Sequence, residues 1–146
     1  MLDLNLDVRL AVCPIVRDPD GLAMSSRNAY LSAGDRQAAL ALSRSLQHAR
    51  EVVESGETNA CAIIEAMRAV FAAEPGAKLE YAAIVEALTL RPVTRAEPGS
   101  VALVAARVGG TRLIDNTILA PCGTSEEERL EMALRGSPIA EAHSVL

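Results

Sequence analysis

The sequence has few aromatic residues and no dense run of basic ones. Its 146 residues include one Phe, two Tyr and no Trp, and 14 Lys and Arg stand against 19 Asp and Glu, a formal net charge of −5. Nucleic-acid-binding proteins present a basic surface, and those that bind single strands add aromatic side chains on which bases stack. Because both features are missing, we expect no nucleic-acid partner.

Long apolar runs and clustered cysteines are absent as well. No stretch approaches the roughly 18 uncharged apolar residues of a membrane span, and the first residues do not have the pattern of a secretory signal. Cys13, Cys61 and Cys122 lie far apart, without C-x-x-C spacing and without a nearby His. This spacing argues against a disulfide framework or a zinc site. We therefore predict a cytoplasmic protein with no membrane partner, no protein-bound metal and buried, reduced thiols.

The sequence is rich in aliphatic side chains, since half of its residues are apolar and few of these are aromatic. "DVRLAVC", residues 7–13, alternates apolar and polar residues and predicts a strand. A helix is predicted over 33–54, with Ser32 as N-cap, Asp35 completing a capping box and Gly56 ending it. Its apolar face comprises Ala39, Leu42, Leu46, Ala49 and Val53.

A second helix is predicted to begin at Thr58 and to end before "EPG" at 74–76. Its apolar positions are Ile63, Met67, Val70 and Phe71. Toward the C-terminus, "SEEERLEMALR" predicts a short helix with Ser125 as cap, within a tail at 121–146 that is otherwise expected to be disordered.

Between the helices the apolar period changes to two. From Lys78, the residues Leu79, Tyr81, Ala83 and Val85 alternate with polar ones, which predicts a strand with these four side chains on one face. Gly109-Gly110 separates two β-rich runs and predicts a two-residue hairpin. The expected fold is α+β, a small antiparallel sheet packed with helices.

One segment, "DGLAMSSRNAYLS" at 20–32, contains hydroxyls, a guanidinium and a glycine close together. Two interpretations follow from the residues alone. Ser25 or Ser26 makes a local turn bond and Arg27 lies on the surface, or the three bind phosphate oxygens while Gly21 lets the backbone approach the ligand. Asp18, with Asp20, is interpreted as part of a turn rather than as a metal ligand.

No catalytic residue is predicted from the sequence. His48 falls within a predicted helix and His143 within the tail, and neither has a paired nucleophile nearby.

Two longer runs carry a resemblance to a known family. "PIVRDPDGLAMSSRNAYLS" (14–32) and "VALVAARVGGTRLIDNTIL" (101–119) are similar to the C-terminal part of pantothenate synthetases, the pantoate–β-alanine ligases, over about residues 3–119. The resemblance implies ATP, pantoate and β-alanine as substrates, with Mg²⁺ assisting. The pantoate carboxylate is adenylated with loss of pyrophosphate, and the β-alanine amine then attacks the pantoyl adenylate.

Carried over by position, the resemblance implies that Ser25, Ser26 and Arg27 hold the ATP phosphates. It implies that Met24 shapes this loop and that the backbone near Val16 meets the adenine. The family's H-x-G-H-type and Gly-x-Lys-Asp-x-x-Gln motifs have no counterpart in the sequence.

We therefore expect only the C-terminal part of such an enzyme, inactive alone. Residues 1–20 would be the last-strand remnant and hinge of a Rossmann-like nucleotidyl-transferase domain, 21–120 a lid domain, and 121–146 a tail. The alternative is a non-catalytic interaction module whose exposed first strand pairs with another chain and whose helices form a homodimer surface.

Overall fold

The computed structural model describes residues 13–135. The strand predicted at 7–13 lies outside the described residues except for Cys13, and so does His143. In chain order the elements are the short 3₁₀ helix η2 (Ser26–Tyr30), α1 (Ala33–Glu54), α2 (Ala60–Ala72), β1 (Ala77–Val85), β2 (Val101–Val108), β3 (Thr111–Ile118) and α3 (Glu126–Leu134).

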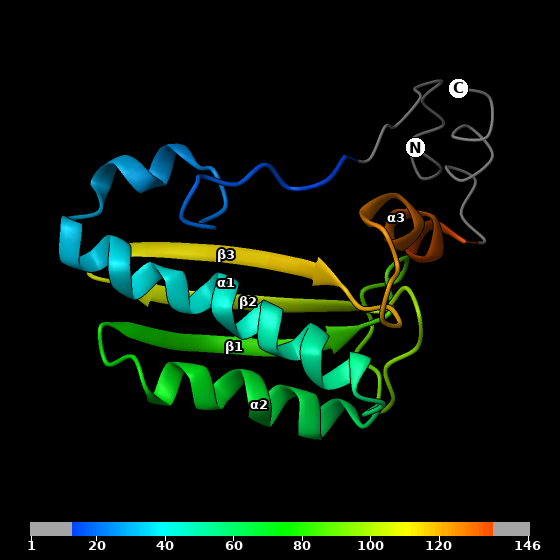
Figure 1. Ribbon diagram of the computed structural model, residues 1–146. Coiled ribbons are helices and arrows are strands. Elements are labelled where there is room, and N and C mark those ends of the chain that lie inside the picture. The colour runs from blue at the N-terminus through cyan, green and yellow to red at the C-terminus, as the bar shows by residue number, and fades with distance from the viewer. Residues whose placement is uncertain (1–12, 136–146) are drawn as a thin grey trace.

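The three strands form one antiparallel sheet in the order β1-β2-β3. Helices α1 and α2 pack against each other and cover one face of this sheet, as Figure 1 shows. The segment that precedes α1, drawn in blue, runs along β3, and α3 lies at the far end of that strand. The predicted α+β class, a small antiparallel sheet with helices, is thereby confirmed.

The core lies between the sheet and the two helices and is aliphatic. On the helix side, Leu42, Leu46, Ile63 and Met67 are at most 2% exposed. On the sheet side, β2 contributes every second residue from Ala102 to Val108, all fully buried. Burying a side chain of Leu or Ile size stabilises the fold by roughly 1.5–3 kcal/mol, so this layer holds the elements together.

The predicted start of α1 is confirmed in detail. The Ser32 hydroxyl accepts from the Asp35 amide at 3.1 Å, and the Asp35 carboxylate accepts from the Ser32 amide at 3.4 Å. The end is also as predicted, because Gly56 adopts φ = 103°, which glycine adopts without steric cost. Ser125 caps α3 with the same reciprocal pair of bonds.

The predicted start of the second helix is wrong by two residues. Helix α2 begins at Ala60 rather than at Thr58, and its N-cap is Asn59. The Asn59 side-chain oxygen accepts from the amides of Cys61 and Ala62. Asn is among the strongest N-cap residues, so it sets the boundary.

The face predicted for β1 is correct at Leu79 and wrong after it. Leu79 pairs with Ala106 and Tyr81 pairs with Ala105, which leaves Glu80 as an unpaired β-bulge. A bulge inserts one residue and so shifts the alternation by one position. As a result Tyr81 is 43% exposed on the outer face. Its place against the helices is taken by the next residues of the strand, Ala82 and Ile84.

The predicted burial of the cysteines is also wrong, because all three are exposed. Cys61 lies in the first turn of α2, on the side away from the buried Ile63, and Cys122 lies in the turn after β3. Among the helices of residues 13–135, none combines the length and apolar character of a membrane span.

Candidate functional site

The site begins with a tight turn between Val16 and Met24. The Met24 amide donates to the Val16 carbonyl at 3.0 Å, and the Asp18 amide donates to the Leu22 carbonyl at 2.8 Å. Gly21 closes the turn with φ = 93° and donates to the Asp18 carbonyl. The turn therefore holds the chain on either side of it at a fixed separation.

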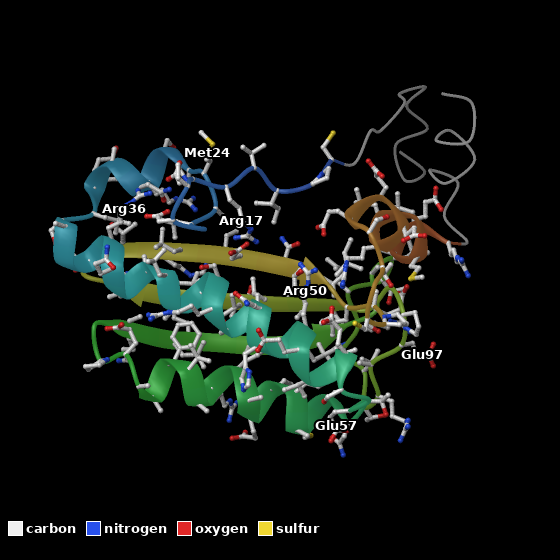
Figure 2. The ribbon with its side chains drawn as sticks, viewed as in Figure 1. Arg17, Met24, Arg36, Arg50, Glu57 and Glu97 are labelled. Atoms are coloured by element: carbon white, nitrogen blue, oxygen red, sulfur yellow. The ribbon has the colours of Figure 1, made fainter. Side chains whose placement is uncertain are left out.

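A single guanidinium clamps both carboxylates of this turn. Arg36, in the first turns of α1, donates to Asp18 at 2.8 Å and to Asp20 at 2.8 and 3.1 Å. Its hydrogen bonds lower the pKa of the Asp20 carboxyl below its ordinary value. Figure 2 shows Arg36 close to the segment that carries Met24 and Arg17. Both aspartates lie within the turn, as the sequence predicts.

A second arginine ties the turn to the sheet. Arg17 makes a bidentate pair with Asp115 of β3, at 2.7 and 3.1 Å, and also donates to the Gly21 carbonyl. The Asp115 side chain is only 2% exposed. Sequence reasoning missed this pair. The available signal was an aspartate at an inward-facing position of β3, between Leu113 and Thr117, because a buried carboxylate requires a partner.

The predicted phosphate-binding residues follow directly. Ser25 is the N-cap of η2, and its hydroxyl accepts from the Arg27 amide at 3.2 Å, as the local-turn interpretation predicts. Asn28 reaches back to donate to the Ala23 carbonyl at 3.0 Å, which closes the loop from inside. Within residues 13–135, neither the Ser26 hydroxyl nor the Arg27 guanidinium has a hydrogen-bond partner, and both residues are exposed.

These residues border adjoining hollows rather than a single pocket. Ser25 and Ser26 line a hollow of about 410 Å³ together with Asp18, Met24 and Asn28. Arg27 lines a cleft of about 570 Å³ whose other walls are Tyr30 and the β2–β3 hairpin, Gly110, Thr111 and Arg112. Arg27 and Ser25 also share a smaller cavity of about 200 Å³ with Met24.

The two residues expected near the adenine are neighbours on the surface. Val16 and Met24 are joined by the backbone hydrogen bond of the turn, and they are 67% and 60% exposed. Exposed apolar side chains of this kind offer a flat contact surface. The structure brings them close to the serine hollow through Met24, which lines it, but Val16 does not line it.

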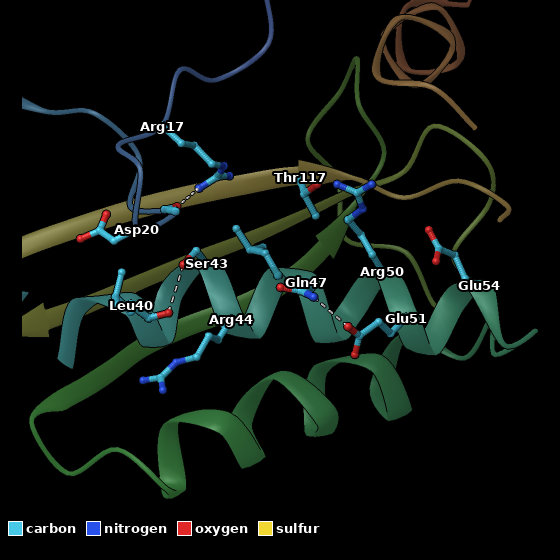
Figure 3. A pocket seen from close by; sticks show the side chains of 12 residues that line it. Arg17, Asp20, Leu40, Ser43, Arg44, Gln47, Arg50, Glu51, Glu54 and Thr117 are labelled. Carbon is cyan, nitrogen blue, oxygen red and sulfur yellow. Dashed lines mark hydrogen bonds between the residues drawn. The ribbon is translucent and has the colours of Figure 1, made fainter. Parts of the chain in front are cut away.

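A separate groove of about 550 Å³ follows α1 and is shown in Figure 3. Its charged lining mixes both signs, with Arg17, Arg44 and Arg50 beside Asp20, Glu51 and Glu54. This balance gives it no clear preference for an anion or a cation. His48, on the same helix, contacts Glu51 at 3.4 Å, and its side chain is 45% exposed.

Comparison with known proteins places this architecture among ligases. The crystal structure of pantothenate synthetase from Thermus thermophilus is similar with a TM-score of 0.78 and 38% sequence identity, covering 82% of this chain and 43% of that one. The pantothenate synthetase of Koribacter versatilis is 50% identical over 127 residues, 87% of this chain and 44% of the relative. The bifunctional pantoate ligase/cytidylate kinase of Gloeobacter violaceus is 48% identical over 136 residues, 92% of this chain and 25% of the relative.

The family profile described as pantoate-beta-alanine ligase matches residues 1–118. The chain belongs to the pantoate–β-alanine ligase family. It spans less than half the length of the curated relatives that it matches.

Proposed function

We propose that this chain is the C-terminal part of a cytoplasmic pantothenate synthetase and that it contributes the phosphate-binding loop for ATP. In this proposal Ser25, Ser26 and Arg27 hold the phosphates, Met24 shapes the loop, and the backbone near Val16 meets the adenine. The complete enzyme would condense pantoate with β-alanine through a pantoyl adenylate. This chain alone would not.

The observation that carries the proposal concerns Ser26 and Arg27. Both are exposed, neither side chain has a hydrogen-bond partner within residues 13–135, and the loop that carries them is held in place. Arg17 and Arg36 fix the preceding turn, and Asn28 fixes the loop from inside. Holding the backbone of a binding loop in place before the ligand arrives reduces the entropy lost on binding. A surface arginine on a disordered loop would lack this advantage.

The chemistry suits the reaction that we propose. Adenylation of a carboxylate releases pyrophosphate, so negative charge grows on the departing phosphates. A guanidinium and hydroxyl donors on a loop whose backbone is held in place stabilise that charge as it develops. The guanidinium of Arg27 can bind two phosphate oxygens at once, while the Ser26 hydroxyl donates a third bond.

The Mg²⁺ that accompanies ATP in such a reaction does not fit the acidic residues of this loop. Asp18 and Asp20 both accept hydrogen bonds from Arg36, so the positive charge that faces these carboxylates is already a guanidinium. Among residues 13–135 there is no group of three or more His, Cys, Asp or Glu side chains placed to hold a metal ion. We therefore assign no step to a metal bound by these residues.

The proposed division of the chain has residues 1–20 as the strand remnant and hinge of the nucleotide-binding domain, 21–120 as the lid and 121–146 as the tail. Pro14, Pro19 and Gly21 flank the proposed hinge, and because Arg17 and Arg36 fasten the Val16–Met24 turn to the lid, we place the opening movement before that turn. Part of the tail is fastened to the lid. Arg129 of α3, 2% exposed, donates to Glu54 at the end of α1 at 3.0 Å.

Calorimetric titration of the chain with ATP tests the loop. Arg27→Ala should weaken binding about tenfold or more, because a charge-assisted contact to phosphate is lost, and Ser26→Ala should weaken it less. Arg91→Ala is the matched control, since Arg91 is also an exposed arginine but lies in the β1–β2 connection. Identical titrations for wild type and Arg27→Ala would remove the phosphate assignment.

The activity of the isolated chain is tested separately. We expect no pantothenate from ATP, pantoate and β-alanine, because the motifs implied for pantoate and most of the ATP site have no counterpart in the sequence. Detectable product from the purified chain would overturn this part of the proposal and leave the loop assignment untouched.

A second candidate function, an interaction module that forms homodimers, is favoured by the outer face of the sheet. Tyr81, Ala105 and Ile114 form one apolar row across the three strands. The Tyr81 and Ile114 side chains are 43% and 54% exposed. Light scattering over a concentration series should show dimers that Ile114→Asp disrupts. A monomer at every concentration would dismiss this candidate.

A further inference from the structure

The β-bulge in β1 places one carboxylate between two arginines. Glu80 is the bulged residue, and its side chain lies on the outer face of the sheet. It accepts from Arg112 of β3 at 2.6 Å and from Arg107 of β2 at 3.1 Å. The hydrogen bond from Arg112 is the largest cause that lowers the pKa of the Glu80 carboxyl, so the group is ionised at neutral pH.

Arg112 also borders the cleft that contains Arg27. The lining residues of this cleft are Arg27, Tyr30, Gly110, Thr111 and Arg112, so its charged side chains are two arginines and, among the described residues, no acid. The hairpin turn supplies one wall, and η2 supplies the other. Two arginines that line one cleft of about 570 Å³ favour a ligand with more than one negative charge.

We propose that Arg112 is a second phosphate-binding residue, which joins Arg27 in holding a polyphosphate chain. In the absence of this ligand, Arg112 is bound to Glu80. This inference rests on the proposed function, because it extends the same phosphate site across to the β2–β3 hairpin. The ligand class is a linear polyphosphate, either the phosphate chain of a nucleotide or a released pyrophosphate.

The arrangement allows Arg112 to change partners at small cost. When Arg112 turns toward a phosphate, Glu80 keeps its pair with Arg107 and is not left without a cation. The Arg112 side chain is 48% exposed, and an exposed ion pair contributes little, so Glu80 restrains Arg112 weakly. A polyphosphate presents more charge than one carboxylate and should compete successfully.

The test measures binding of inorganic tripolyphosphate to the chain by calorimetry at low ionic strength. Arg112→Gln should weaken binding about three- to tenfold, because one of two cationic contacts is lost. Glu80→Gln should strengthen it about two- to fivefold, because the competing carboxylate is gone. A damaged fold can only weaken binding, so the gain from Glu80→Gln cannot come from misfolding.

Arg107→Gln is the matched control. Like Arg112→Gln, it removes one arginine charge that contacts Glu80, but Arg107 does not line the cleft. Equal losses of affinity for Arg107→Gln and Arg112→Gln would mean that the effect comes from the net charge of the chain, and would overturn the inference. So would an unchanged affinity in Arg112→Gln, or no binding of tripolyphosphate by the wild-type chain.

The outcomes also separate this inference from the proposed function. If Arg27→Ala weakens binding and Arg112→Gln does not, the inference fails and the loop assignment stands. If Arg112→Gln weakens binding while Arg27→Ala binds both tripolyphosphate and ATP as wild type does, the loop assignment fails instead.

Discussion

The two faces of the sheet differ in the burial and chemical character of their side chains. The face that α1 and α2 cover is made of buried aliphatic residues such as Val104 and Val108, both fully buried. The outer face and the adjoining segment before α1 expose arginines, a bulged glutamate and apolar side chains such as Tyr81 and Met24. The covered face therefore accounts for stability, and the chemistry that we propose lies outside this packed layer, in the exposed segment before α1 and at the β2–β3 hairpin.

This separation has a physical basis. Packing of side chains at crystal-like density tolerates little change, whereas exposed groups are free to bind a ligand. The ion pairs Arg17–Asp115 and Arg36–Asp18 connect the two regions, because they fix an exposed loop to the packed layer. Substitutions on the two sides should therefore separate stability from binding.

The largest expected effect is on the packed side. Leu42, 1% exposed on α1, lies in the centre of the core. Leu42→Ala should lower the free energy of unfolding by about 2–5 kcal/mol, through lost burial and the cavity left behind. Met24→Ala removes a comparable apolar side chain that is 60% exposed, and should change stability by less than about 0.5 kcal/mol. Urea unfolding compares the two, and equal losses would contradict the division between the faces.

A smaller effect is expected where the two regions meet. Arg17→Met leaves the nearly buried Asp115 carboxylate without its cation, and should cost about 1–3 kcal/mol, because Arg17 itself is about one-third exposed and partly screened. Adding Asp115→Asn to Arg17→Met removes the unpaired charge and should restore part of the loss. Urea unfolding of both single variants and the double variant gives the coupling energy. Additive losses would mean that the pair does not fasten the loop.

Local sequence patterns predicted the parts of the fold that depend on local physics. The Ser32 capping box and the Gly109-Gly110 hairpin each need only a few neighbouring residues, and both are confirmed. The bulge at Glu80 was missed because it depends on how β1 pairs with β2, which no period-two pattern in β1 records. Tyr81 was assigned to the wrong face for the same reason.

The candidate site divides in the same way. Ser25, Ser26 and Arg27 stand together in the sequence, so their composition marks them as a candidate for anion binding. Their support comes from residues distant in sequence: Arg17 bonds to Asp115 across 98 positions. The place of Arg112 in the Arg27 cleft likewise follows from the tertiary arrangement alone. The cysteines were misplaced because residue type gives an average tendency to burial and says nothing of which helix side is covered.

The smallest effect expected is a change in how stability depends on pH. Arg36 lowers the pKa of Asp20, so between the lowered and the ordinary value the folded state binds fewer protons than the unfolded state. The contribution of Asp20 to stability is therefore present above its ordinary pKa of 3.8 and is lost as the pH falls through the lowered value.

Arg36→Gln should remove this contribution and flatten the decline in stability, measured by urea unfolding from about pH 6 to pH 2. Arg68→Gln, which removes an equal charge from the exposed side of α2, should leave the steeper decline of the wild type. Parallel curves for wild type and Arg36→Gln would mean that the clamp holds the loop in place without contributing to its stability against acid.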